Sequence, residues 1–414
     1  MVHVSKMIII LFLLFLLFPE RKVSASPGEF KTNDYPIILI HGVGGWGKEE
    51  VSNFYYWGGI HDIENYLNTQ GFETYTAAVG PVSSNWDRAA ELFAYIKGGA
   101  VDYGAAHSLQ HHHLRFGKKY SGVKTDWNAV NRVHLLGHSM GGQTSRMLLE
   151  LLKSGSKEEK DFHKNNPDAE QMSSLYDGGK DWVHSITTLA TPHDGSPFAN
   201  KLENFMPFLK GFVYKYINLA DLHSNESFNY DFKLDHWGLK REGNEPVYSY
   251  VERMFNSPFW KTKDTSQYDL SIEGAKELNE KMKTYSDVYY FSYTGDATFH
   301  SPLTGYNVPL PSMNPLLYPS GFYIGRYENN QLGSSWWPND GLVSVPSSQY
   351  PNGHKAQPAQ STSEKGVWNY HKTQYRWDHA DFIGLSLYDT VGLSDIRAFY
   401  REISVELASL PSLD

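Results

Sequence analysis

The sequence predicts an α/β fold with a mostly parallel, doubly wound central sheet. Short apolar runs with the length and branching of buried strands alternate along the chain with segments whose apolar residues recur at helical spacing. One such run, Val133–Leu136, leads into the pentapeptide Gly137-His-Ser-Met-Gly141 and then into a helical pattern that reaches Leu152. A strand, a sharp turn and a helix in this order form the context in which a G-x-S-x-G motif presents a nucleophilic serine.

The predicted elements follow one another without an internal repeat. Five apolar runs are predicted to be buried strands: residues 35–40, 74–79, 133–136, 183–190 and 288–293. Six segments have helical periodicity: residues 62–67, 86–97, 140–152, 197–222, 272–282 and 394–410. Three segments rich in charged residues, polar residues, proline or glycine are expected to be connections or loops: residues 154–167, 296–335 and 364–375.

Length and composition exclude some classes of protein. The chain has 414 residues, which is enough for a large hydrophobic core. Its net charge is −9, which argues against a nucleic-acid partner. It contains no cysteine, so the core or bound ions, rather than disulfides, must stabilise the fold.

Residues 1–25 have the pattern of a secretory signal peptide. Lys6 precedes the unbroken apolar run Met7–Phe18, and Val23-Ser-Ala25 offers small residues for cleavage. The run is too short for a spanning helix, so no stable membrane span is expected; an uncleaved membrane anchor is the alternative. The pattern therefore predicts a secreted, extracellular protein with a single domain over residues 26–414.

Ser139 and two later residues are the candidate catalytic triad. A serine hydroxyl needs a base within hydrogen-bond reach and an acid that orients this base. The α/β-hydrolase fold, which the context of Ser139 indicates, places the acid and then the histidine after the serine. Asp340 lies on a tight turn, and His379 precedes the last predicted helix. His371 lies in a polar stretch and is expected at the surface.

Two backbone N–H groups are the candidate donors to an oxyanion. The first predicted strand ends in His41-Gly42, and in this fold the residue after such a turn, here Val43, donates one N–H. The second donor is the N–H of Met140, which follows the nucleophile where the helix starts. Together with Ser139 and its base, these groups predict acyl transfer through an acyl-enzyme.

Residues 197–222 contain more aromatic and aliphatic side chains than one buried helix face requires. A core helix is one interpretation. The other is a mobile lid, whose apolar face covers the site in water and turns outward at a lipid interface. The segment follows the strand after Ser139, where hydrolases carry cap insertions, and we predict a lid here.

Most of residues 34–410 resembles the secreted lipases of the staphylococcal and thermostable Geobacillus type. The motifs that carry this resemblance are narrower than G-x-S-x-G: residues 81–88 (PVSSNWDR), 101–107 (VDYGAAH), 190–195 (ATPHDG), 230–235 (YDFKLD), 377–379 (WDH) and 395–400 (DIRAFY). The resemblance implies hydrolysis of triacylglycerols at an oil–water interface by Ser139, Asp340 and His379. A carboxylesterase or phospholipase with the same triad is the alternative. A catalytically inactive lipid-binding module is a third, which the intact triad argues against.

The resemblance also implies a structural zinc ion between the core and the lid-bearing insertion. Its implied ligands are two carboxylates and two imidazoles, a set that closes a tetrahedral shell: Asp87, His107, His113 and Asp235. From spacing alone, His107 and His111 would share one helix face. A surface histidine cluster without metal is the other alternative.

A calcium ion near the catalytic histidine is likewise implied by the resemblance. Its implied ligands are oxygen donors, as calcium prefers: Asp378, Asp381, Ser386, Asp389 and a backbone carbonyl near Ser312. The staphylococcal pattern has an acid where this chain has Ser386. One charge is therefore missing, and weaker calcium binding is expected.

Overall fold

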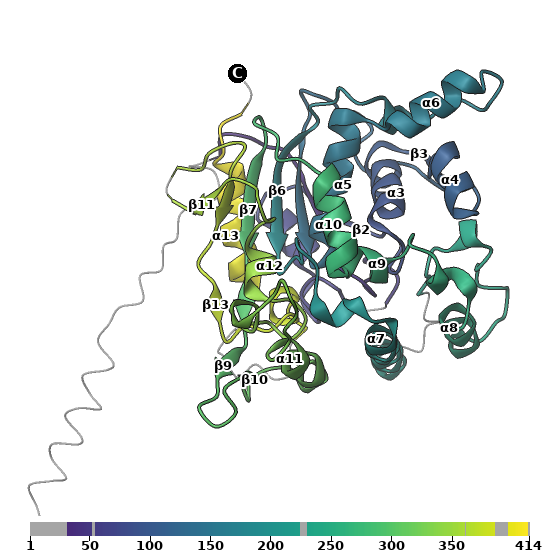
Figure 1. The fold of residues 1–414 in the computed structure, drawn as a ribbon. Helices are drawn as coiled ribbons and strands as arrows, with labels where there is room; N and C mark the ends of the chain where they lie inside the picture. The colour runs from purple at the N-terminus through teal and green to yellow at the C-terminus, as the bar shows by residue number, and fades with distance from the viewer. Residues whose placement is uncertain (1–30, 52–53, 224–229, 361, 386–395, 413–414) are drawn as a thin grey trace, which may run out of the picture.

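A seven-stranded, fully parallel sheet forms the centre of the protein (Figure 1). The computed structural model describes residues 31–51, 54–223, 230–360, 362–385 and 396–412. The predicted signal peptide, Ser386 and Asp389 lie outside these residues. The sheet has the order β11-β12-β7-β6-β5-β1-β2. Its strands are β1 (Ile37–Ile40), β2 (Thr74–Ala77), β5 (Val133–His138), β6 (Val183–Leu189), β7 (Tyr289–Tyr293), β11 (Ala356–Pro358) and β12 (Trp368–Tyr370). The predicted α/β class is confirmed.

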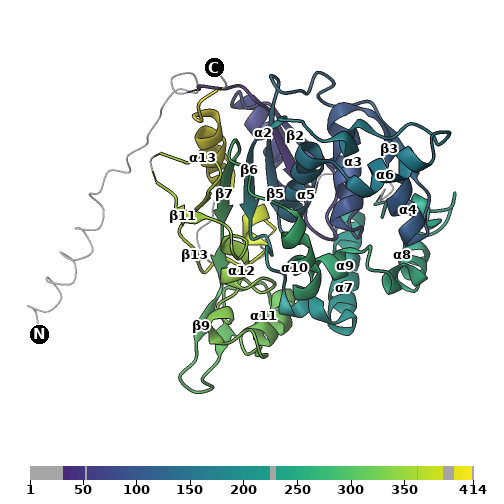
Figure 2. The same ribbon diagram turned by 45° about the horizontal axis from the view of Figure 1, so that its top comes forward.

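Helices cover both faces of the sheet, which is why its strands are nearly continuous apolar runs. Alternate residues of β1 belong to different cores: Ile37 and Leu39 pack in one, Ile38 and Ile40 in the other. The first core includes α2 (Ile63–Thr69) and α13 (Ile396–Ala408). The second includes α3 (Asn85–Lys97), α5 (Met140–Ser154) and α10 (Ile272–Lys281). Turning the molecule shows the same two layers around the sheet (Figure 2).

The strand order places a functional crevice at one point of the sheet. From β1 the chain continues outward to β2, whereas from β5 it continues in the other direction to β6 and β7. In open α/β sheets, ligands bind outside the carboxyl ends of the strands at such a switch point. Here that point is the end of β1 and β5, where His41-Gly42-Val43 and Ser139 follow their strands.

The remaining elements surround this framework. The helices are α4 (Ala105–His111), α6 (Lys157–Asn165), α7 (Leu202–His223), α8 (Val247–Phe255), α9 (Ser266–Leu270), α11 (Tyr318–Ile324) and α12 (Val345–Gln349). The short strands are β3 (Gly99–Asp102), β4 (Phe116–Tyr120), β8 (Gly295–Asp296), β9 (Thr298–His300), β10 (Asn307–Pro309) and β13 (Gln374–Tyr375). No helix among the described residues has the length and apolar character needed to cross a membrane.

Three segments predicted as connections or loops contain regular structure. Residues 154–167 contain α6, which Ser156 caps by accepting the N–H of Glu159. This helix has almost no buried face, so apolar periodicity could not reveal it. Residues 364–375 contain β12, whose place depends on pairing with β7 and β11. Residues 296–335 contain β9, β10 and α11, elements too short for a sequence pattern.

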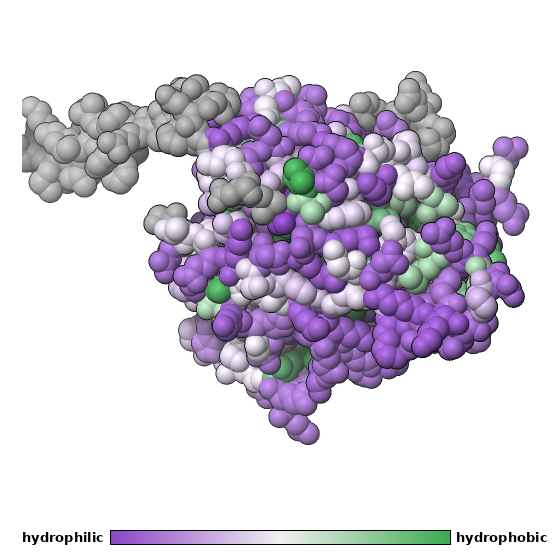
Figure 3. All heavy atoms as spheres, turned by 90° about the horizontal axis from the view of Figure 1, so that it is seen from above, coloured by the Kyte–Doolittle hydropathy of each residue, from purple (hydrophilic) through white to green (hydrophobic). Residues whose placement is uncertain are grey.

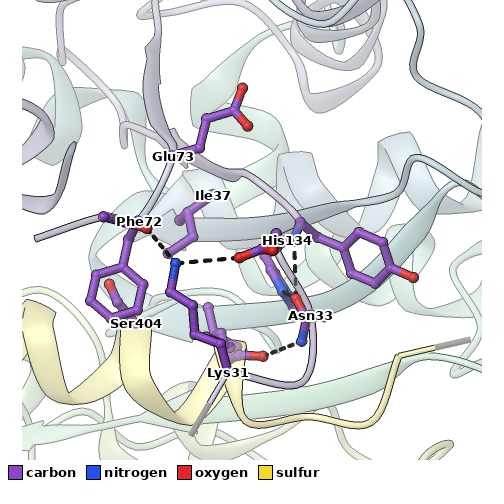
Figure 4. Close-up of a pocket in the computed structure, with 12 residues that line it drawn as sticks. Lys31, Asn33, Ile37, Phe72, Glu73, His134 and Ser404 are labelled. Carbon is purple, nitrogen blue, oxygen red and sulfur yellow. Dashed lines mark hydrogen bonds and ion pairs between the residues drawn. The ribbon is translucent and has the colours of Figure 1, made fainter. Parts of the chain in front are cut away.

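The two ends of the molecule along the strand direction differ in character. At the lower end in Figures 1 and 2, α7, α11 and the β9–β10 hairpin lie together beyond the sheet. The opposite end, seen from above in Figure 3, is mostly hydrophilic. At that end, a cavity of about 190 Å³ separates the start of the described chain from α13 (Figure 4). Asn33 bridges it, donating to the carbonyls of Leu407 and Leu410 and accepting from His134.

Candidate active site and metal centre

Ser139 lies at the turn between β5 and α5 with φ 54° and ψ −128°. This backbone conformation is strained for a residue with a side chain, by about 1–3 kcal/mol. Its N–H donates to the Leu189 carbonyl at 2.8 Å, and its carbonyl accepts the Thr191 hydroxyl at 2.8 Å. The turn is thus fixed from β6, and Ser139 is held at the end of the central strand.

The two outer glycines of the motif are required by close backbone approach. A Cβ on Gly137 would lie 2.3 Å from the Gly141 carbonyl carbon, and a Cβ on Gly141 would lie 2.0 Å from the Ile40 oxygen. No side chain fits at either position. The pentapeptide therefore brings α5 directly against the ends of β1 and β5.

Asp340 and His379 form a buried acid–base pair. His379 Nδ1 lies 2.8 Å from Asp340 Oδ2, and the His379 N–H donates to the Asp340 carbonyl at 2.8 Å. The other carboxylate oxygen, Oδ1, accepts the N–H groups of Leu342 and Val343 at 2.9 and 2.8 Å. The carboxylate therefore fixes the ring and keeps the proton on Nδ1, leaving Nε2 as the basic nitrogen. His371 instead pairs with Glu406 at 3.3 Å and is part-exposed.

The pair lies close to the turn that carries Ser139. The ring of His138, the residue before Ser139, is 4.7 Å from the ring of His379 between centroids. Among the described residues, the Ser139 hydroxyl has no hydrogen-bond partner. Serine–histidine hydrogen bonds of this kind often tighten only when substrate is bound.

The predicted oxyanion donors, the N–H groups of Val43 and Met140, belong to residues that lie next to Ser139. Gly42 lies so close to the nucleophile that a Cβ on it would be 2.7 Å from Ser139 Cβ. The N–H groups on either side of Val43 are engaged, Gly42 with the Tyr56 hydroxyl and Gly44 with the Pro81 carbonyl. Met140 is the first residue of α5, a position whose N–H has no acceptor within the helix.

Tyr56 and His138 connect residues 41–44, the loop after β1 that we call the oxyanion loop, to His379, and sequence reasoning missed both. The Gly42 N–H donates to Tyr56 Oη at 2.8 Å, and Tyr56 Oη lies 2.6 Å from His138 Nδ1. His138 Nε2 lies 3.0 Å from the His379 carbonyl, which can only accept. His138 therefore donates from Nε2 and accepts the Tyr56 hydroxyl at Nδ1. Burial, followed by the nearby His379, holds the pKa of His138 well below its usual value, so it stays neutral.

Arg88, the last residue of the motif at residues 81–88, has a structural role behind the oxyanion loop. Its guanidinium is fully buried and donates to the Gly80 carbonyl at 2.7 Å, to the Thr144 hydroxyl at 2.8 Å and to the His41 carbonyl. Burial lowers the pKa of Arg88 to about 10, so the charge persists at neutral pH. One side chain thus joins the ends of β1, α3 and α5 behind the oxyanion loop.

An apolar cavity of about 30 Å³ lies over Ser139. Its wall includes Val43 and, from α7, Phe205 and Phe208. A Cβ on Gly44 would lie 3.1 Å from Leu209 and Phe212, so α7 also packs directly on the oxyanion loop. A cavity of this size leaves too little room for a long acyl chain while α7 lies in this position.

A group of four ligand-type side chains joins α3 to the segments around α4 and α9. One ligand atom from each lies within 4.8 Å of the others, and the members are Asp87, His107, His113 and Asp264. These atoms are buried, with nitrogen–oxygen separations of 3.2–3.3 Å, yet none has a hydrogen-bond partner among the described residues. Converging buried donors and acceptors without hydrogen bonds fit a bound cation.

Asp235 is not part of this group, and its assignment as a ligand was wrong. Its side chain is 48% exposed and lies 3.9 Å from Lys240. Asp235 starts the short 3₁₀ turn Asp235–Trp237, which directs the next residue, His236, inward instead. His236 Nε2 lies 2.9 Å from Asp87 Oδ2, the oxygen that is not in the group. His236 therefore orients Asp87, as residues around metal ligands commonly do.

The histidines near α4 separate into two kinds. His107 and His111 share a face of α4, with ring centroids 4.6 Å apart, but only His107 belongs to the group. His113 follows the helix, and its Nδ1 lies 2.9 Å from the Leu114 carbonyl. The proton is thereby held on Nδ1, and Nε2 presents a lone pair to the group.

The described part of the predicted calcium site is bound by backbone N–H groups. Asp378 is buried, and its carboxylate accepts the N–H of Asn314 at 2.6 Å and of Ala380 at 2.8 Å. Asp381 Oδ2 accepts the N–H of Asp378 at 2.7 Å. The bond to Asn314 brings the loop of Ser312 beside Asp378. Burial raises the pKa of Asp378 to about 6, a cost that a bound cation would offset.

The chain is similar to known proteins over most of its length. Residues 33–412 match the family described as "Lipase-like, C-terminal domain". The chain is 40% identical over 399 residues to a lipase of Staphylococcus epidermidis and 38% identical over 396 residues to lipase 1 of Staphylococcus aureus. These matches cover 95% and 94% of this chain but 56% of each relative, so the chain spans about half the length of these relatives.

Three solved structures share the fold. EstA from Clostridium botulinum has a TM-score of 0.85 at 40% identity, covering 94% of this chain and 93% of that one. Lipase 1 from Pelosinus fermentans has a TM-score of 0.81 at 44% identity, covering 91% and 99%. The lipase of Staphylococcus hyicus has a TM-score of 0.78 at 38% identity, covering 92% and 97%. The predicted resemblance to staphylococcal lipases is confirmed.

Proposed function

The chain belongs to the lipase-like, C-terminal domain family, and from that premise we propose that it is a triacylglycerol lipase. One observation carries the proposal. A strained serine, φ 54°, lines an apolar cavity, and the residue before it, His138, packs ring to ring against His379 of the buried Asp340–His379 pair. Nucleophile, oriented base and apolar surroundings are what hydrolysis of a hydrophobic carboxylic ester needs.

The proposed reaction has two acyl-transfer steps. His379 Nε2 takes the Ser139 proton as Oγ attacks the ester carbonyl, and the N–H groups of Val43 and Met140 bind the oxyanion. His379 then returns the proton to the alcohol oxygen, which leaves, and Ser139 remains acylated. A water molecule attacks this acyl-enzyme by the same route and releases the fatty acid. Asp340 stabilises the imidazolium in both steps without accepting its proton.

The proposal includes α7 as a lid. The helix packs on the oxyanion loop and lines the cavity over Ser139, and we infer that substrate entry requires α7 to move. Its buried side chains are apolar: Phe205, Leu209, Val213 and Ile217. Their exposure is costly in water and favourable at an oil surface, which predicts activity that rises at an interface.

A rate profile over esters of increasing acyl length, taken through the solubility limit of each, tests the function. A lipase is expected to show a rise in rate once droplets form and to accept long-chain triacylglycerols. A carboxylesterase would prefer short soluble esters and show no such rise, and a phospholipase would hydrolyse diacylphospholipids faster than glycerides. Absence of hydrolysis with every ester would overturn all three and leave a lipid-binding module.

We also propose secretion, on the pattern of residues 1–25 alone. N-terminal sequencing of protein recovered from the culture medium tests it. A mature chain that begins near Ser26 is expected, and an intact Met1 on membrane-bound protein would indicate the uncleaved anchor instead.

We propose that Asp87, His107, His113 and Asp264 hold a structural Zn²⁺. Two imidazole nitrogens and two carboxylate oxygens supply a closed tetrahedral set. The ion would join α3 to the segments around α4 and α9, and it has no part in the acyl-transfer chemistry. A chain without disulfides gains stability from such a link.

Asp264→Ala is expected to remove the zinc, and Asp235→Ala is its matched control. Wild-type protein and Asp235→Ala should each contain about one zinc per chain. Asp264→Ala should bind zinc at least about tenfold more weakly and melt at a lower temperature, because it loses a ligand and leaves two imidazoles without their charge partner. Metal analysis by mass spectrometry and thermal unfolding measure both effects. Zinc lost from Asp235→Ala but retained in Asp264→Ala would contradict the assignment.

We propose a weaker calcium site at Asp378 and Asp381, with Ser386 and Asp389 as further ligands. Adding calcium to chelated protein is expected to raise its melting temperature by mass action. Half-saturation is expected only at a high calcium concentration, because Ser386 contributes no charge to the site. Ser386→Asp should shift half-saturation to lower calcium. An unchanged melting temperature across the titration would reject the site.

A further inference from the structure

Residues 297–325 contain no Asp, Glu, Lys or Arg, in a chain that is 20% charged overall. The segment comprises β9, β10, the 3₁₀ turn Pro315–Leu317 and α11, and we refer to it as the uncharged rim. In both ribbon views it lies beside α7 at one end of the molecule (Figures 1 and 2).

The uncharged rim also concentrates exposed apolar side chains. Five of the thirteen large hydrophobic side chains that are exposed among the described residues belong to it: Phe299, Leu303, Tyr306, Leu316 and Phe322. Leu303, at the tip of the β9–β10 hairpin, is 97% exposed. Single exposed apolar residues are ordinary, but five on one segment without charge supply apolar area for contact with a hydrophobic partner.

The uncharged rim is hydrogen-bonded to the residues next to Asp340 and His379. The Ala297 N–H donates to the Asn339 carbonyl at 3.0 Å, next to Asp340. The Asn314 N–H donates to Asp378, the residue before His379. Contacts of this kind hold the rim at a fixed position relative to the acid–base pair.

The rim is also in contact with the proposed lid. Met313 and Leu317 form a small hydrophobic core with Phe208 of α7. Phe208 is also part of the wall of the cavity over Ser139. The uncharged rim therefore borders the side on which substrate must enter when α7 moves.

We propose that the uncharged rim is the surface with which the protein docks on a droplet of neutral glycerides. The proposal rests on the proposed lipase function and names the segment that makes contact. A rim without charge can enter an oil surface without desolvating ions. An anionic bilayer would instead be recognised by clustered Lys and Arg, which the rim lacks, and the net charge of −9 would oppose it. Docking there would deliver glyceride to the edge of α7.

Leu303→Asp tests the proposal, with Val130→Asp as the matched control. Val130 is 74% exposed but lies in the loop before β5, at the amino end of the central strand, away from Ser139. Flotation with triolein droplets should show Leu303→Asp binding about tenfold more weakly than wild type, and Val130→Asp binding as wild type does. The ratio of the rate on emulsified tributyrin to the rate on a soluble acetate ester should fall similarly in Leu303→Asp alone.

Equal droplet binding by the two variants would overturn the docking proposal, as would stronger wild-type binding to anionic phosphatidylglycerol vesicles than to triolein. These outcomes are separate from failure of the proposed function. If wild-type protein hydrolysed no ester, the flotation arm would still compare the two variants, and the lipase proposal alone would fail.

Discussion

Ser139→Ala is expected to lower kcat for ester hydrolysis by about 10⁶-fold, since removing the nucleophile of a triad costs as much as removing the triad. Ser139 carries its hydroxyl at the strained turn after β5, and the ring of the preceding residue, His138, lies 4.7 Å from the ring of His379 between centroids. The measurement is the single-turnover and steady-state rate on a soluble chromogenic ester, so that droplet binding does not enter.

Ser145→Ala is the matched control for this variant. It also removes a buried hydroxyl from α5, one that donates to the Gly141 carbonyl at 2.8 Å. Its loss should change kcat by less than about tenfold, because it affects only a neutral hydrogen bond. Activity that survives in Ser139→Ala, at equal folding by circular dichroism, would show that the nucleophile has been misassigned.

The central sheet could be predicted because its strands obey a local rule. Four consecutive apolar residues before a His-Gly turn fit a strand buried on both faces, and β1 is such a strand. β12 could not be predicted in this way. Its middle residue is Asn369, whose amide donates to the carbonyls of Tyr290 and Glu364, so the strand is stabilised by partners that are distant in the sequence or lie in a loop.

The group of four ligand-type side chains contains one residue, Asp264, that was not predicted from the sequence. Asp87, His107 and His113 were predicted through the resemblance, whereas spacing alone favoured His107 and His111. The fourth member of the group comes from a region without a local signal, and Asp235 was predicted in place of Asp264. The error is informative, because His236, the next residue after Asp235, does reach Asp87. The 3₁₀ turn Asp235–Trp237 turns His236 inward and leaves Asp235 exposed, and sequence periodicity does not predict which of two adjacent residues faces inward.

The hydrogen-bonded connection from Gly42 through Tyr56 and His138 to His379 could not be predicted from the sequence. Tyr56 lies 82 positions before His138, in a segment without helical or strand pattern. Its role follows only from the hydrogen bonds that run from Gly42 to the His379 carbonyl. Residues that position a catalytic group through others are found from three-dimensional contacts, whereas the nucleophile has its own motif.

Asp340→Asn is expected to lower kcat by about 10⁴-fold with little change in KM, because the side chain touches no substrate. The structure gives the physical reason. Two N–H groups, of Leu342 and Val343, point at Oδ1, so the amide oxygen of Asn must take that place. The amide NH₂ then faces His379 Nδ1 and stabilises the tautomer with its proton on Nε2. That nitrogen can no longer accept the Ser139 proton.

Asp296→Asn is the matched control, since Asp296 is a nearby carboxylate that accepts from Thr298 and not from His379. It should retain kcat within about tenfold, as expected for a group that acts on the site only through neighbouring structure. ¹H NMR of the imidazole N–H protons provides a second readout: wild type should show a downfield Nδ1–H resonance, and Asp340→Asn should lose it. A variant with normal kcat, or with the Nδ1–H resonance intact, would mean that Asp340 does not set the tautomer of His379. The residue that orients the base would then have to be sought among its other neighbours, beginning with His138.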